Sequence, residues 1–206
     1  MPDINLPVIL IAALISMASP GPATLAIAGT SMASGRKSGL PLASGIATGA
    51  LVWSTSAALG LGAIMAQNAW ILEGVRYFGA AYLLFLACKS ARSASSRRNI
   101  GLKPVAGDAA ALFSKGLALH VSNPKAVLFY GSLYSIGLPA EASAAELATV
   151  IIAVGIQGFV IFLGYALVFS SAGMTRIYFR LRRWFEGAFA LGFGAASLKI
   201  LTARLQ

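Results

Sequence analysis

The chain has 206 residues, of which 58% are apolar and only 11% are charged, and its mean hydropathy is +0.79. A composition this apolar excludes an ordinary soluble domain and indicates a protein of the lipid bilayer. The net charge of +10 does not indicate nucleic-acid binding, because the basic residues lie between hydrophobic runs, where they act as orientation signals. Cys88 is the only cysteine, so neither a disulfide framework nor a thiolate metal site is expected.

Six hydrophobic segments follow one another along the chain. The first two, 4–35 and 38–72, contain no ionisable side chain, and each exceeds the roughly 20 residues that a spanning helix needs. The third, about 70–88, begins with charged residues; the fourth, about 116–138, holds polar residues near its middle. The fifth, 147–175, is again free of ionisable side chains, and the sixth, about 184–202, carries Glu186 near its start. The expected fold is therefore an all-α membrane protein with six transmembrane helices.

Basic residues concentrate in the loops that follow the first, third and fifth segments. By the positive-inside rule these loops face the cytoplasm, so a multi-pass protein of the inner (plasma) membrane with both termini external is expected. The residues concerned are Arg36 and Lys37, then Lys89, Arg92, Arg97, Arg98, Lys103 and Lys115, then Arg176, Arg180, Arg182 and Arg183.

The two halves of the chain resemble each other. The stretches "FGAAYL" (78–83) and "SGIATG" (44–49) correspond to "FGAASL" (193–198) and "VGIQG" (154–158), and "SPGP" (19–22) corresponds to "SNPK" (122–125). Three helices per half is an odd number, so the second half must enter the membrane from the opposite side. Two inverted three-helix repeats are typical of secondary transporters. One transporter domain, 1–206, is therefore expected, with repeat one at about 4–90, a cytoplasmic linker at about 90–113 and repeat two at about 114–206.

The prolines of the first segment predict a broken helix. Each proline lacks an N–H group, so Pro20 leaves the carbonyl of Ser16 without its helical partner, and Pro22 does the same to Ala18. Unsatisfied carbonyls are costly in hydrocarbon. A kink without further function is the alternative, but two matched breaks favour a polar site inside the membrane.

Each break can also start a half-helix. Ser19 and Asn123 stand directly before Pro20 and Pro124, a pattern that predicts N-caps. The positive end of each half-helix suits an anion such as a carboxylate. Lys125 adds a formal charge near the middle of the fourth segment, where charges are usually functional; the alternative is a side chain that snorkels to the cytoplasm.

Catalytic motifs are absent from the sequence. There is no HExxH or GxSxG stretch, and the six acidic residues are expected in loops or at helix ends, so neither an intramembrane hydrolase nor any other enzyme is expected. No cofactor and no metal ligand set is predicted either.

Two stretches of the sequence resemble the motifs of a known protein family. The stretch "SPGPATLAIAGTSMASGRKSGLPLASGIATGALVW" (19–53) resembles the N-terminal signature of the lysine exporter (LysE/RhtB) family, and "SNPKAVLFY" (122–130) resembles its second motif. The resemblance extends over essentially the whole chain in length, six-span pattern and motif order. It implies an inner-membrane exporter of amino acids or close derivatives that is driven by proton exchange.

The candidate site residues come from two sources. The family motifs supply Pro20, Gly21, Pro22, Asn123, Pro124 and Lys125. Polarity and position add Ser19, Thr24 and Gln157, and His120 and Lys125 are the candidates for proton coupling.

These observations predict an amino-acid exporter that works by alternating access around a midplane site at the paired breaks. A neutral or hydroxylated amino acid is expected rather than a basic one, because no buried carboxylate is expected for a second positive charge. The expected partners are the amino acid, protons and the bilayer, and a homodimer is left open. Two alternatives remain: an exporter or channel for another small solute or ion, which would need clusters of ligands, and a non-transporting membrane scaffold, which would not need polar groups at matched depth.

Overall fold

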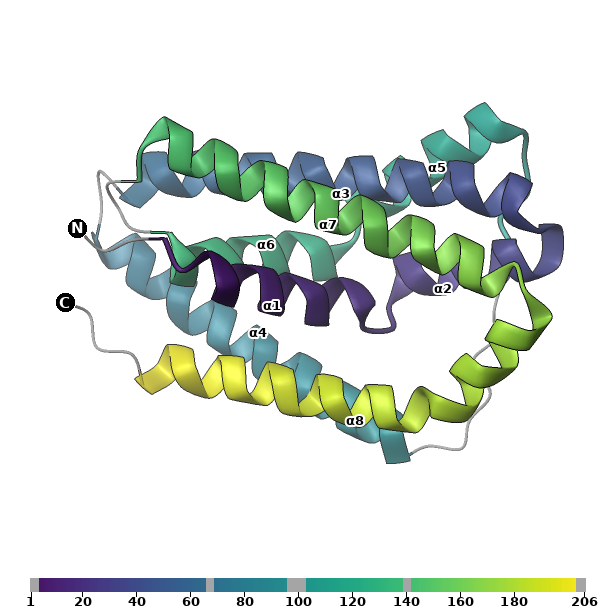
Figure 1. The fold of residues 1–206 in the computed structure, drawn as a ribbon. Helices are drawn as coiled ribbons and strands as arrows, with labels where there is room; N and C mark the ends of the chain where they lie inside the picture. Colours follow the sequence, from purple (N-terminus) through teal and green to yellow (C-terminus); the bar gives the residue numbers. More distant parts are fainter. Residues whose placement is uncertain (1–3, 66–68, 96–102, 139–141, 203–206) are drawn as a thin grey trace.

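The computed structural model describes residues 4–65, 69–95, 103–138 and 142–202. Within these ranges the chain forms eight α-helices and no strand (Figure 1). This confirms the all-α prediction. The helices are α1 (Leu6–Ala18), α2 (Pro22–Ser34), α3 (Arg36–Met65), α4 (Ala69–Ser95), α5 (Ala109–Val121), α6 (Pro124–Gly137), α7 (Ala144–Phe169) and α8 (Ala172–Thr202).

The first and fourth predicted segments are each broken into two helices where the sequence places its prolines. Helices α1 and α2 form an angle of 52°, and α5 ends at Val121, three residues before α6 begins at Pro124. Helix α3 accounts for the second predicted segment as far as Met65, and the fifth, 147–175, includes the end of α7 at Phe169 and the start of α8 at Ala172. The third and sixth predicted segments lie within helices that are longer than expected. Helix α4 continues to Ser95, and α8 begins at Ala172 rather than near Trp184.

The number of membrane spans is supported only in part. By length and composition, α3 over Arg36–Gly60 and α7 over Ala144–Phe169 can each cross a membrane, and α1 with α2 makes a third span if the bent pair counts as one. Six spans therefore stay a prediction.

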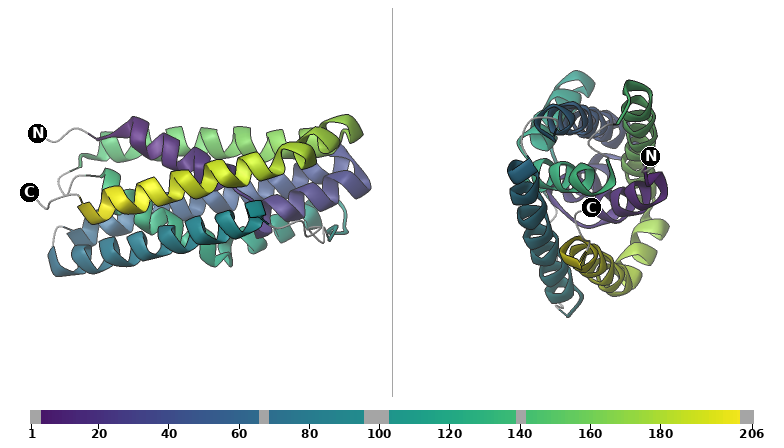
Figure 2. Two further views of the ribbon diagram at one scale, coloured as in Figure 1. Left: turned by 90° about the horizontal axis from the view of Figure 1, so that it is seen from below. Right: turned by 90° about the vertical axis from the view of Figure 1, so that its left-hand side faces the viewer.

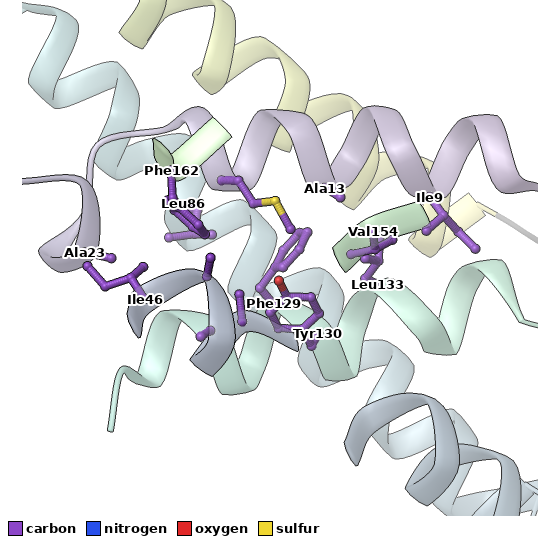
Figure 3. Packing of buried hydrophobic residues seen from close by; sticks show 14 of the residues in the cluster. Ile9, Ala13, Ala23, Ile46, Leu86, Phe129, Tyr130, Leu133, Val154 and Phe162 are labelled. Carbon is purple, nitrogen blue, oxygen red and sulfur yellow. The ribbon is translucent and has the colours of Figure 1, made fainter. Parts of the chain in front are cut away.

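The helices form an elongated bundle (Figures 1 and 2). Helix α3 packs along α5 and α7, and α4 packs along α8, while α1 contacts α6, α7 and α8. Helix α1 begins and α8 ends at the same end of the bundle; the junction of α2 with α3 and the turn between α7 and α8 lie at the opposite end (Figure 1). Buried apolar side chains of several helices meet inside, among them Ile9 of α1, Phe129 of α6 and Val154 of α7 (Figure 3).

Glycines allow α3 and α5 to approach closely. A Cβ atom added at Gly45 would overlap the backbone of Phe113, and one added at Gly116 would overlap the carbonyl of Leu42. The same addition at Gly49 would lie 2.9 Å from the Cβ of His120. Small residues four apart on a membrane helix commonly permit such backbone contact, so this pair of helices depends on them.

The predicted linker is partly helical and partly packed. Its two ends belong to α4 and α5, and residues 96–102 lie outside the described residues. The segment before α5 packs against α2. A Cβ atom added at Gly29 would lie 2.9 Å from the carbonyl oxygen of Lys103, and the N–H of Val105 donates to Thr30 Oγ1 at 2.9 Å.

Candidate functional site

The break between α1 and α2 is wider than predicted. Ser19 is the C-cap of α1, with an extended ψ of 142°, and α2 begins with Gly21 as N-cap and Pro22 at the first helical position. The prediction that Ser19 is the N-cap of a half-helix beginning at Pro20 is therefore wrong. Pro20 and Pro22 are both suited to start a helix, and the chain uses the second one, so Ser19 to Gly21 connect the two helices.

The carbonyl groups that the prolines free find donors elsewhere in the bundle. The carbonyl of Ser16 accepts from Ser19 Oγ at 2.9 Å and from Lys125 Nζ at 3.0 Å. The carbonyl of Ala18 accepts from the hydroxyl of Tyr165 on α7. Both groups are therefore satisfied inside the protein, as an environment without water requires.

The second break has the predicted N-cap. Asn123 precedes α6, and its side-chain oxygen accepts from the backbone N–H of Lys125 at 3.1 Å. Pro124 occupies the first helical position, where its missing N–H costs nothing. The cap places Lys125 in the first turn of α6.

Lys125 joins the two breaks. Its ammonium group donates to the carbonyls of Ser16 at 3.0 Å and Ser19 at 3.2 Å, and to the hydroxyl of Ser19. The C-terminal end of α1 carries a partial negative charge that favours a cation, whereas the first turn of α6 does not. The ammonium is therefore held by the acceptors of α1, and it lies at the break rather than snorkelling to a membrane surface.

Gly21 lies beside this ammonium. A Cβ atom added to Gly21 would be 3.4 Å from both Cδ and Nζ of Lys125. The backbone of Gly21 is extended, with φ −163° and ψ −179°, a conformation open to any residue. A Cβ at this distance makes an ordinary van der Waals contact, so an alanine would fit here, and only a larger side chain would extend into the space of the lysine.

Two cavities border the breaks. The smaller has a volume of about 30 Å³ and is lined by residues that include Ser16, Thr24, His120 and Lys125; it has room for about one water molecule. The larger has a volume of about 570 Å³, within the range of roughly 300–1,000 Å³ typical of small-molecule sites. Its lining comes from both breaks, from α4 and from α8, and includes Ser19, Pro20, Gly21, Pro22, Asn123 and Lys125.

His120 is a buried residue of the smaller cavity. Only 5% of it is exposed, and its ring packs edge-on against Phe162 at 5.7 Å between centroids. Within the described part of the chain, neither ring nitrogen has a hydrogen-bond partner. The ring nitrogens of His120 are therefore available to a polar ligand or a water molecule in that cavity.

Most predicted site residues come together, but Gln157 does not. Six of them line the larger cavity, and Thr24 lines the smaller one, where its hydroxyl accepts from the N–H of Gly21 at 2.8 Å. Gln157 lines neither cavity; its amide nitrogen donates to the carbonyl of Leu10 at 3.0 Å. It links α7 to α1 on another side of the bundle.

Glu186 is a buried acidic residue that the sequence did not single out as a site residue. It is only 3% exposed, it accepts from Ser93 Oγ at 2.7 Å, and it lines the larger cavity together with Lys125. The prediction that every acidic residue lies in a loop or at a helix end is wrong here, because α8 begins fourteen residues earlier, at Ala172. The available signal was the i,i+4 spacing of Arg182 and Glu186, which is typical of a helix.

No group of three or more His, Cys, Asp or Glu side chains is placed to hold a metal ion within the described residues. The polar groups that do converge are an ammonium, hydroxyls, an amide and helix ends. This set suits a small organic ion with a carboxylate.

Known proteins of similar sequence bear on this site. The chain is 28% identical over 187 residues to the threonine efflux protein of Salmonella typhi, covering 88% of this chain and 91% of that protein. It is 27% identical over 187 residues, with the same coverage, to the threonine efflux protein of Escherichia coli (strain K12). It is 31% identical over 157 residues to the leucine efflux protein of Enterobacter sp. (strain 638), covering 76% of this chain and 74% of that protein.

No solved structure matches the chain. The family model for LysE type translocators, in contrast, matches residues 14–204. That match includes both helix breaks, the lysine that joins them and the lining of the larger cavity. The chain belongs to the family of LysE type translocators.

Proposed function

We propose that this chain exports neutral amino acids from the cytoplasm by proton-coupled alternating access, with the substrate bound at the paired helix breaks. The relatives are named threonine and leucine efflux proteins, which supports amino acids as the substrate class and a transporter rather than an enzyme. The observation that carries the proposal is the position of the Lys125 ammonium on the break between α1 and α2, beside a cavity of about 570 Å³.

The substrate carboxylate binds between Lys125 and the first turn of α2. The present acceptors of the ammonium are two carbonyls and one hydroxyl, all neutral, and a carboxylate forms a stronger, charge-assisted hydrogen bond. The Thr24 hydroxyl accepts from the N–H of Gly21, but no N-cap side chain accepts from the first turn of α2 among the described residues, so the N–H groups of Ala23 and Thr24 can contribute as well. Binding therefore exchanges partners on Lys125 and alters the contact between α6 and the end of α1.

The helices are arranged as two inverted repeats, α1–α4 and α5–α8. A two-fold axis in the membrane plane would pair α3 with α7 and α4 with α8, and both pairs are in contact. The two breaks occupy equivalent places, and α1 begins at the same end of the bundle at which α8 ends (Figure 1). This agrees with six spans and with termini on one side of the inner membrane, which the basic loops place outside.

The larger cavity is the inward-facing access route. Its lining includes Ser19 at the break, Lys89 and Ser93 of α4 and Arg182 of α8. Lys89 and Arg182 belong to the basic stretches that the positive-inside rule assigns to the cytoplasm. An amino acid would enter there and meet Lys125 at the inner end. His120 and Lys125, which share the smaller cavity, are the candidates for carrying the coupled proton.

Efflux from proteoliposomes tests this function. Purified protein is reconstituted into vesicles loaded with one labelled amino acid, and release is measured with and without an inward proton gradient. Threonine and leucine are expected to leave faster than from protein-free vesicles, and an imposed gradient is expected to accelerate release. Release equal to that of protein-free vesicles for every amino acid tested would exclude amino-acid export, whereas release that ignores the gradient would exclude proton coupling alone.

A further inference from the structure

We propose that Glu186 binds the ammonium group of the substrate, so that the larger cavity selects a zwitterion by its two opposite charges. This inference rests on the proposed function, because it assigns the second pole of the same site. Lys125 and the first turn of α2 hold the carboxylate at one part of the cavity wall. Glu186, from α8, supplies the negative charge at another part of it.

The charges that line the cavity are unequal in number. Lys89, Lys125 and Arg182 are positive, and Glu186 is the one acidic residue among the described residues that line it. An ammonium that leaves water needs a hydrogen-bond acceptor, and a charged one compensates best for the lost hydration. Among these lining side chains only Glu186 offers that charge, whereas a carboxylate has several partners.

Glu186 is buried and is contacted by side chains of both α4 and α8. Arg182 Nε is 4.0 Å from Glu186 Oε1, and Arg182 Nη2 donates to Ser93 Oγ at 2.9 Å. Ser93 in turn donates to the same carboxylate oxygen, Oε1, at 2.7 Å. Ser93 and Arg182 thus both contact Oε1, and the neutral hydroxyl of Ser93 makes the shorter contact.

A purely structural role for Glu186 is the competing explanation. The same contacts tie α4 to α8, which pack along each other. A tie of this kind includes the i,i+4 ion pair with Arg182, so it accounts for the charge of Glu186 but not for the place of the carboxylate in the lining of the cavity. Glu186 and Lys125 line the same cavity. Two opposite charges that share a cavity match the two charges of an α-amino acid.

The test compares substrates that differ only in the amine. Competition against labelled leucine efflux is measured with leucine, with N-acetyl-leucine and with 2-hydroxy-4-methylpentanoate, which has a hydroxyl in place of the amine. Wild-type protein is expected to prefer leucine to both analogues by about 30-fold or more, the fold-change that corresponds to loss of a buried charge pair. In Glu186→Gln that preference should fall to within a few-fold, because the affinity for leucine drops while that for the analogues does not.

Two further variants make the result decisive. Asp108→Asn also replaces a carboxylate by an amide, at an exposed N-cap of α5 that lies outside both cavities, and it should keep the wild-type preference. If Glu186→Gln does not fold, Glu186→Asp keeps the charge on a shorter side chain. This variant should lower the affinity for leucine and leave the affinity for the two analogues unchanged.

The possible outcomes separate this inference from the proposed function. Wild-type protein that exports leucine and its analogues equally well overturns the role of Glu186 and leaves amino-acid export intact. An unchanged preference in Glu186→Gln, or equal losses for all three compounds in Glu186→Asp, also overturns it. Wild-type protein that exports none of the compounds contradicts the proposed function itself, and this inference with it.

Discussion

Replacing Lys125 by methionine removes the ammonium and keeps an unbranched side chain of similar length. The ammonium makes three hydrogen bonds at the end of α1, and a hydrogen bond to a charged group contributes a net 1.5–3 kcal/mol or so. Removing a half-buried charge also removes its desolvation cost, which offsets much of this loss. The free energy of unfolding should therefore fall by only about 1–2 kcal/mol.

Transport should respond much more strongly than stability. Loss of a buried partner of the substrate carboxylate costs about 2–5 kcal/mol, which corresponds to a rise in the half-saturation constant of about 30-fold or more. Lys125→Arg should retain part of the activity, because a planar guanidinium keeps the charge but not its compact shape. The assay is concentration-dependent threonine efflux from proteoliposomes, with thermal unfolding of the same preparations as the check on folding.

A matched control separates this effect from a general loss of positive charge. Lys115 donates to the carbonyl of Ala106 at 2.7 Å, is exposed and lies outside both cavities, so Lys115→Met should export normally. If Lys125→Met had a normal half-saturation constant for threonine efflux and a normal response to a pH gradient, Lys125 would neither bind the carboxylate nor couple the proton. The N–H groups of α2 would then have to hold the carboxylate alone.

Three other predictions concern the break, the packing and the topology. Gly21→Leu should abolish efflux without unfolding the protein, because the leucine side chain would occupy the space of the Lys125 ammonium. The control is Gly164→Ala, which adds a methyl group to open space. Normal efflux from Gly21→Leu would mean that the break is a kink without a role in substrate binding. Gly116→Leu should instead prevent folding, since even a Cβ overlaps the carbonyl of Leu42; folded protein with an unchanged melting temperature would contradict the described packing. Reporter fusions after Ser95 and Ser171, which follow α4 and α7, should read as cytoplasmic, and a fusion after Ala142 should read as external. The opposite pattern would reverse the proposed orientation.

Local features of the fold could be predicted from the sequence. Proline lacks an N–H wherever it stands, so the two breaks follow from Pro20, Pro22 and Pro124 without any tertiary information. Asn123 caps α6 as its type and position predict. The cap of α2 was misassigned because two prolines two residues apart can each begin a helix, and the choice between them depends on packing around Gly21.

Long-range features could not be predicted in the same way. The sequence indicated that the carbonyls of Ser16 and Ala18 need donors, but not that these would be Lys125 and Tyr165, from α6 and α7. Glu186 was missed because the arginines that precede it indicate a loop, whereas the helix continues through them. Gln157 was selected for its polarity, and its partner, the carbonyl of Leu10, depends on how α7 packs against α1.

Equilibrium binding tests the central claim most directly, because it separates the site from the coupling mechanism. Labelled threonine and leucine are titrated onto purified protein in lipid nanodiscs, for wild type, Lys125→Met, Gly21→Leu and the control Gly164→Ala. The proposed site predicts saturable binding to wild type and to the control, and binding weakened by about 30-fold or more in the two variants at the break. Equal affinity in all four folded proteins would contradict a site at the paired breaks.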